Sequence, residues 1–220
     1  NKGETDQKQI EDKDIKVVYC THNFKYHSRF AYALLAKTKY VMLFDDDTIP
    51  GERWLENCIK TEKVTNGIVG GSGVILLEDS YVPNQKVGWR GIKNNSIVEV
   101  DLVGHSWFMK REYLKYLWFE EPISWENGED IQLSYLAQKY AGIKTYVPPQ
   151  PENRPDLCSS LYGSEFGANG SSSKDMVKSG KRVGNKNHTL QRNEICKIAI
   201  ENGWKTYLSR YKMEQHDDEM

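Results

Sequence analysis

The stretch YVMLFDDDTIPG (40–51) decides the fold. Its first five residues are apolar and bulky, as in a buried strand, and the run ends abruptly in three carboxylates, Asp45, Asp46 and Asp47. Adjacent carboxylates at a strand end repel one another unless a cation or a basic side chain neutralises them. The stretch therefore predicts a buried strand with a charged site at its carboxyl end.

The residues before this stretch complete a larger unit. IKVVYC (15–20) has the composition of another buried strand, and the segment from about 28 to 37 has that of an amphipathic helix. Strand, helix and strand in this order form a βαβ unit, which predicts an α/β fold with a central, mostly parallel sheet flanked by helices. Ligands of such sheets bind at the carboxyl ends of the strands, where the three aspartates lie.

The rest of the chain continues with helices and strands. The expected elements are a helix over 52–63, a strand over 68–77, a turn-rich excursion over 78–96, a strand over 97–109 that breaks at Gly104, a short helix over 110–116, a helix within 124–142 that Gly142 ends, a strand over 143–147 and a helix over 191–211. We expect one domain over 15–211, with polar tails at 1–14 and 212–220. Residues 158–190 contain few apolar side chains, so we expect a flexible lid or a disordered segment there.

Composition restricts the partners. The 220 residues carry 30 basic and 31 acidic side chains, a formal net charge of -1, so generic binding of nucleic acid loses its main driving force. No apolar run is long enough to span a bilayer, and the first fifteen residues lack the apolar core of a signal peptide. We expect no membrane span and a cytoplasmic chain, or a lumenal one in the secretory pathway if an N-terminal anchor was removed. The cysteines, Cys20, Cys58, Cys158 and Cys196, lack CxxC spacing and are expected as free thiols.

The aspartate run is the strongest candidate site. A solvated turn is the alternative, but such a turn rarely follows five consecutive apolar strand residues. We therefore interpret the run as a site for a hard divalent cation, and its oxygen ligands favour Mg²⁺ or Mn²⁺.

On these residues the chain resembles the nucleotide-sugar-dependent glycosyltransferases of the GT-A fold, a Rossmann-like single domain. That family ends a sheet strand with an Asp-x-Asp element whose last Asp binds the metal that bridges the donor diphosphate. Asp45 and Asp47 match the element, which makes Asp47 the direct ligand and places Asp45 and Asp46 at the donor. The resemblance implies transfer of a hexosyl or pentosyl group from a nucleotide diphosphate-sugar to a hydroxyl of a glycan or glycoconjugate acceptor, with Mn²⁺ or Mg²⁺ as cofactor.

A second motif adds to the resemblance. NGEDI (127–131) is similar to the Glu-Asp signature that opens an acceptor-side helix in these enzymes. In inverting members the Asp takes the proton from the acceptor hydroxyl, so Asp130 is the candidate base, and Glu129 is expected to hydrogen-bond a sugar. Retaining, exostosin-like members have a similar run in which the Asp has no evident base role, and both subgroups stay open. Two carboxylates at a helix start also fit a simple capping role.

Five further residues match the family more loosely, and they are Asn23, Arg29, Gly104, His105 and Trp107. The first two correspond to residues that touch the nucleotide, although Arg29 could equally pair with Asp46. The other three lie where the family has a loop against the transferred sugar. A core position for Trp107 is nearly as plausible as stacking on a sugar.

His188 is a candidate additional metal ligand, because several GT-A families use a late His, and the alternative is ordinary polar surface. The family begins with a strand and helix that form the floor for the nucleotide base, and nothing similar precedes IKVVYC (15–20). The resemblance covers about residues 15–150, and either the N-terminal strand of the family is missing from the sequence or the nucleotide pocket is built differently. It leaves the identity of the base open.

Other functions are alternatives. A sugar-nucleotide pyrophosphorylase shares the fold and the metal, but it needs an early Gly-rich loop with a basic residue, which the sequence lacks. A non-catalytic carbohydrate- or Ca²⁺-binding domain also accounts for clustered carboxylates, and a lectin would bind sugar without nucleotide. A haloacid-dehalogenase-type phosphohydrolase is disfavoured, because Thr48 directly follows Asp47 and the spacing of its motif is not met.

Overall fold

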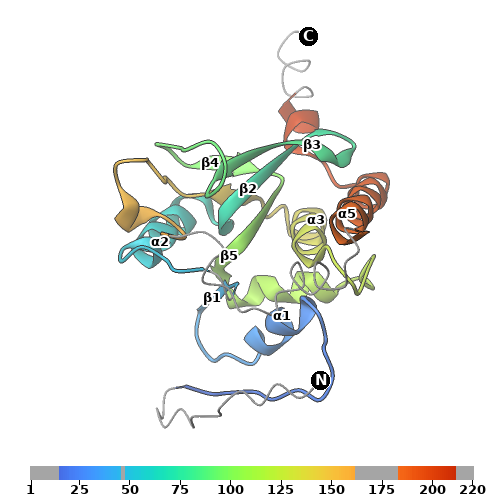
Figure 1. Cartoon of the computed structure of the whole chain (residues 1–220), viewed down its shortest axis with the longest axis horizontal. Helices are drawn as coiled ribbons and strands as arrows, with labels where there is room; N and C mark the ends of the chain where they lie inside the picture. The colour runs from blue at the N-terminus through green and yellow to red at the C-terminus, as the bar shows by residue number, and fades with distance from the viewer. Residues whose placement is uncertain (1–14, 46–47, 162–182, 212–220) are drawn as a thin grey trace.

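The computed structural model describes residues 15–45, 48–161 and 183–211, and it has a mixed α/β fold with an open sheet and helices on both sides (Figure 1). The elements in chain order are α1 (His27–Ala33), β1 (Tyr40–Phe44), α2 (Trp54–Thr65), β2 (Ile68–Glu78), β3 (Ser80–Gly88), β4 (Val98–Val100), β5 (Leu102–Lys110), the 3-10 helix η1 (Arg111–Trp118), α3 (Glu129–Ala141), β6 (Thr145–Val147), the 3-10 turn η2 (Pro155–Leu157) and α5 (Val183–Glu201). The expected α/β class is confirmed.

The direction of the strands differs from the expectation. The sheet has the order β1-β5-β2-β6-β4, with β3 also paired to β2. Among the described strands only the β2–β6 pair is parallel, so the prediction of a mostly parallel sheet was wrong. The turn-rich excursion over 78–96 contains β3, which returns along β2 after a turn at Asp79. Antiparallel neighbours need only such a short link, whereas parallel neighbours need a long crossover.

The expected first strand over 15–20 is not part of the sheet. The segment is exposed and has no regular secondary structure, and Tyr19 keeps 75% of its surface in contact with solvent. A buried strand needs a neighbour for its backbone groups and a surface for its side chains. The segment pairs with no described strand, so the prediction of a buried strand there was wrong.

Alternation along the strands sorts the core onto two faces of the sheet. Ile68 and Trp107 belong to the cluster that packs against α1, η1 and α3. Their chain neighbours Val69 and Phe108 point to the other face, where they pack against Trp54 of α2. This period of two is the geometry of a pleated strand. A third cluster joins α3 and α5 beside the sheet.

The ends of the helices follow the expected turn chemistry. α3 begins after Gly128 (φ 84°) and ends at Gly142 (φ 64°), two left-handed positions that suit glycine, and the predicted stop at Gly142 is confirmed. α5 begins at Val183, earlier than the expected helix over 191–211, and the chain breaks at 202–206 before helical residues 207–211. Most of the expected lid, residues 162–182, lies outside the described residues.

Two smaller expectations concern the membrane and the cysteines. None of the helices in the described ranges is both long and apolar enough to cross a bilayer. All four cysteines are free thiols, as expected, with Cys20 exposed and the other three buried.

Candidate functional site

Arg29 joins the two acidic motifs. Asp45 directly follows β1, and Glu129 opens α3. The Arg29 guanidinium donates one Nη to Asp45 Oδ1 and the other to Glu129 Oε1, the second at 2.8 Å. The end of a sheet strand and the start of a distant helix therefore share one site, and Arg29 is a basic partner of Asp45.

The position of Arg29 depends on a buried tryptophan. The guanidinium carbon lies 4.4 Å from the centroid of the Trp107 ring, a cation–π contact, and the Trp107 indole N–H donates to the carbonyl of Val103 at 2.8 Å. Trp107 is only 2% exposed and packs edge-on against Phe30. Its place is therefore below Arg29 in the core, and stacking of this ring on a sugar does not fit its burial.

His105 lies at the other carboxylate oxygen of Asp45, the one that Arg29 does not contact. The His105 Nδ1 atom lies 3.5 Å from Asp45 Oδ2, Thr48 Oγ1 lies 3.0 Å from His105 Nε2, and the Trp89 ring stacks on the imidazole with centroids 3.6 Å apart. Burial alone would raise the pKa of Asp45, but the contacts with His105 and Arg29 hold that pKa below its usual value. Asp45 is therefore a stable anion.

A β-bulge in β5 sets the direction of His105. Gly70 of β2 pairs with Trp107, whereas Ser72 pairs with Gly104, so β5 has an extra residue in this interval. His105 has a φ of 70°, a left-handed value that is unusual for a residue with a side chain. The loop and strand break expected around Gly104 are thus a bulge inside a continuous strand, and such bulges commonly re-aim a side chain.

Asp130 is held by an arginine that the sequence analysis missed. Arg192 of α5 donates to both Asp130 oxygens, at 3.0 and 2.8 Å, and the Ile131 backbone N–H donates to Oδ1 at 2.9 Å. Arg192 also lies 4.2 Å from the ring centroid of Tyr81. Burial alone would lower the pKa of Arg192, but Asp130 raises it above the usual value. The pair is a buried, bidentate ion pair that ties α5 to the start of α3.

Glu129 has a strongly raised pKa. Its side chain is almost completely buried, and burial together with the nearby charge of Asp130 raises its pKa from 4.5 to about 7. The charges of Arg29 and Arg192 act in the opposite direction and are weaker. A carboxyl group with a pKa near neutrality exchanges protons readily under physiological conditions.

Gly104 leaves space beside the Asp130 carboxylate. A β-carbon added at Gly104 would lie 3.8 Å from Asp130 Oδ2 and would meet no other atom within 4 Å, apart from its own chain neighbours. A side chain of ordinary size at this position would fill that space. The glycine therefore keeps one approach to the carboxylate open.

The remaining predicted site residues lie apart from this cluster or outside the described chain. The Asn23 side chain accepts a hydrogen bond from the Lys25 backbone N–H at 2.9 Å, just before α1. Burial and the charge of Arg192 lower the pKa of His188, and the charge of Asp130 opposes them, so the ring lies near the Arg192 pair. Asp46 and Asp47 fall in the gap at 46–47. Within the described ranges no three His, Cys, Asp or Glu side chains gather as a metal-binding group.

The structure thus brings together residues from four separate stretches singled out in the sequence, and they are Arg29, Asp45, Gly104, His105, Glu129 and Asp130. Arg192 had no local sequence signal, since it is one polar residue of a helix far along the chain. No family model matches the chain, and no curated protein matches it at a significant level.

Proposed function

We propose that the chain is a metal-dependent glycosyltransferase of the GT-A type, which moves a sugar from a nucleotide diphosphate donor to a hydroxyl of a glycan acceptor. The observation that carries the proposal is the Arg29 bridge, because it puts the aspartate run and the Glu-Asp motif into one site. A transferase of this kind needs a cation site for the leaving diphosphate beside a carboxylate for the acceptor hydroxyl. The mixed α/β fold is compatible with this proposal. That the fold is of the GT-A type is itself proposed.

The described residues are chemically suited to a divalent cation. Asp45 is an anion at a strand end, and each carboxylate oxygen has two lone pairs, so it keeps acceptor capacity beside Arg29 and His105. Carboxylate oxygens are ligands that Mn²⁺ and Mg²⁺ accept. In the proposal Asp45 and Asp47 hold Mn²⁺ or Mg²⁺, and the ion supplies charge neutralisation for the departing diphosphate.

Asp130 is proposed to receive the hydrogen of the acceptor hydroxyl. Arg192 and the Ile131 N–H fix the orientation of its carboxylate, and Gly104 leaves room for the hydroxyl beside Oδ2. Fixing a proton acceptor in its reactive direction lowers the entropic part of the barrier. Glu129 is a second candidate for the same role, because its pKa of about 7 lies near the working pH of most enzymes.

The test of this function is metal-dependent binding of nucleotide, followed by transfer. We expect Mn²⁺ together with a nucleotide diphosphate to raise the melting temperature of the chain, and we expect Asp47→Asn to abolish that rise because it removes a ligand charge. The matched control is Asp79→Asn, which removes an exposed carboxylate at the turn between β2 and β3.

The outcomes separate the candidate functions. A panel of nucleotide diphosphate-sugars is then screened for Mn²⁺-dependent release of nucleoside diphosphate, with and without glycan acceptors. Stabilisation by nucleotide that needs no metal, or that Asp47→Asn leaves unchanged, would overturn the proposal. Binding of glycans with no response to any nucleotide would favour a non-catalytic carbohydrate-binding domain.

A further inference from the structure

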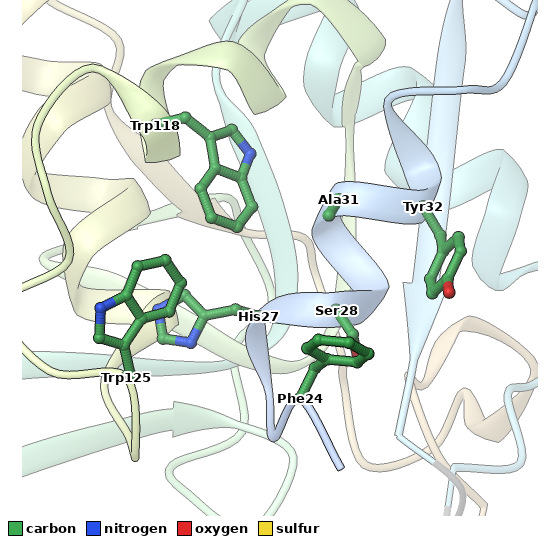
Figure 2. A pocket seen from close by; sticks show the side chains of 7 residues that line it. All are labelled: Phe24, His27, Ser28, Ala31, Tyr32, Trp118 and Trp125. Atoms are coloured by element: carbon green, nitrogen blue, oxygen red, sulfur yellow. The ribbon is translucent and has the colours of Figure 1, made fainter. Parts of the chain in front are cut away.

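A pocket of about 290 Å³ opens beside α1 (Figure 2). Its lining residues are Phe24, His27, Ser28, Ala31, Tyr32, Trp118 and Trp125. Positions 27, 28, 31 and 32 share one face of a helix, whereas residue 29 points away from that face. The pocket therefore lies next to the charged cluster without containing any of its side chains.

Aromatic rings form the walls of this pocket. The His27 ring lies 6.1 Å from the Trp118 ring and 5.4 Å from the Trp125 ring, both measured between centroids. Figure 2 shows the two indoles on one side and Phe24, Ser28 and Tyr32 on the other. Trp125 remains 54% exposed, an unusual degree of exposure for a large aromatic side chain. One wall of the pocket is thus open to solvent.

Three buried nitrogen atoms at this pocket have no hydrogen-bond partner. His27 is 2% exposed, and neither its Nδ1 nor its Nε2 atom is paired with any group in the described part of the chain. The same holds for the Trp118 Nε1 donor. An unsatisfied buried polar atom destabilises the folded state, so native proteins rarely retain several at one place. These nitrogens lie under the pocket surface, so a ligand that brings hydroxyl groups satisfies them only when the side chains that cover them move aside.

The charges around the pocket favour an uncharged ligand. Burial lowers the pKa of His27, the charge of Asp130 opposes it more weakly and the charge of Arg29 adds to it, so the ring is neutral near pH 7. A neutral imidazole offers one donor and one acceptor. At the rim, Lys25 is already paired with Glu126 at 3.2 Å, and Arg29 is already paired with two carboxylates. No positive group at the described rim is left to hold a phosphate.

We infer that this pocket binds a neutral sugar ring of the acceptor glycan, with its C–H face on the Trp118 and Trp125 indoles and its hydroxyl groups on the His27 nitrogens. Aromatic faces carry partial negative charge and attract the partially positive C–H groups of a sugar. A purely apolar ligand would leave the three nitrogens unpaired, whereas hydroxyl groups both donate and accept. The identification of this sugar as part of the acceptor rests on the proposed function. Sugar binding itself needs neither nucleotide nor metal.

The test measures sugar binding in the absence of nucleotide and metal. The probes are the methyl glycosides of glucose, galactose, mannose and N-acetylglucosamine, titrated while tryptophan fluorescence is recorded. We expect at least one glycoside to bind and to change the fluorescence, and we expect Trp125→Ala to weaken that binding about tenfold, as the loss of one stacking face implies. The matched control is Tyr211→Ala, which removes another half-exposed aromatic ring outside the pocket and leaves binding unchanged.

His27→Phe provides a second variant that keeps the size and burial of the side chain. It removes both ring nitrogens, so we expect a folded protein that no longer binds the glycoside. Binding that survives in His27→Phe, or the absence of any glycoside response in the wild type, would overturn the inference. A response to cyclohexanol or to a detergent equal to that of the best glycoside would identify an apolar site and would also overturn it.

The same measurements separate this inference from the proposed function. No glycoside binding together with Mn²⁺-dependent nucleotide binding would contradict the inference about the pocket and support the proposed transferase function. Glycoside binding without any response to nucleotide would support the inference about the pocket and contradict the proposed transferase function. If both hold, Trp125→Ala should raise the KM for the glycan acceptor and leave the KM for the donor unchanged.

Discussion

Two regions on opposite faces of α1 differ in how their polar groups are satisfied. On one face Arg29 binds Asp45 and Glu129, and nearby Arg192 binds Asp130. On the other face the His27 nitrogens have no partner in the described chain. The paired charges keep their geometry without a ligand, whereas the pocket gains hydrogen bonds only when something enters it. The charged cluster is therefore suited to chemistry, and the pocket is suited to recognition.

The largest expected effect comes from breaking the buried ion pair on the charged side. Arg192→Met leaves the Asp130 carboxylate buried without its bidentate partner, so we expect a loss of about 3–5 kcal/mol in the free energy of unfolding. Urea unfolding followed by circular dichroism measures this loss. The control is Arg53→Met, because the Arg53–Glu56 pair has a similar distance of 2.8 Å but is exposed, and its removal should hardly move the unfolding midpoint. Equal losses in the two variants would show that burial of the Asp130 pair has no special weight.

The next effect is a dependence on pH at Glu129. Its folded pKa of about 7 lies above the ordinary value of 4.5, so between these values the folded state holds a proton that the unfolded state has released. The contribution of Glu129 to stability is therefore present below about pH 4.5, falls as the pH rises to about 7 and stays low above that. In Glu129→Gln this fall is absent, so the variant should gain stability relative to the wild type as the pH rises from 5 to 8.

The comparison with the wild type at each pH is needed, because the pKa of buried Asp101 is also raised, to about 6. Thermal melts of both proteins across the range isolate the Glu129 contribution. A constant difference between them would mean that Glu129 is ionised throughout. The same variant sharpens the assignment of the base: loss of the limb near pH 7 in kcat/KM would favour Glu129, and an unchanged profile would favour Asp130.

A smaller effect of opposite sign is expected in the pocket. His27→Phe replaces two unpaired buried nitrogens with carbon, so we expect the ligand-free protein to gain about 1 kcal/mol. The gain should increase below about pH 6.5, because unfolded His27 takes up a proton that the buried ring, with its lowered pKa, does not. Chemical unfolding at pH 5.5 and 7.5 measures both values. A loss of stability at both pH values would mean that the imidazole already makes a favourable interaction.

The sequence predicted the parts of the fold that depend on local patterns. The apolar run 40–44, the helix stop at Gly142 and the two acidic motifs are all visible in short windows, and the structure contains the first two as expected. The meeting of the acidic motifs followed from a resemblance, not from a local pattern. The residue that joins them is Arg29, for which the sequence analysis considered the nucleotide or Asp46 as partner, and its described partners are Asp45 and Glu129.

The sequence could not predict features that depend on pairing between distant segments. β3 has few apolar residues because much of it is exposed, so it resembled a turn-rich segment. The apolar run 15–20 resembled a buried strand, but a strand is stabilised by its neighbours, which composition does not identify. The Arg192 ion pair and the aromatic pocket were missed for the same reason. Each combines residues from separate elements, and no periodicity or motif connects them.

The smallest expected change in stability is at Gly104, which lies beside the Asp130 carboxylate. In the proposed function the acceptor hydroxyl approaches Asp130 past this glycine. Its added methyl group would lie in ordinary van der Waals contact, 3.8 Å from Asp130 Oδ2, so Gly104→Ala should change the free energy of unfolding by no more than about 0.5 kcal/mol. The methyl group would nevertheless occupy the open approach to the carboxylate, and we expect about a tenfold or larger fall in kcat/KM for the acceptor with donor binding unchanged. Gly70→Ala is the contrasting variant, since its methyl group would overlap the Val103 side chain and should destabilise the sheet itself. Steady-state kinetics and unfolding curves of both variants give the answer. A Gly104→Ala enzyme that folds normally and transfers sugar at the wild-type rate would show that the acceptor does not reach Asp130 past this glycine.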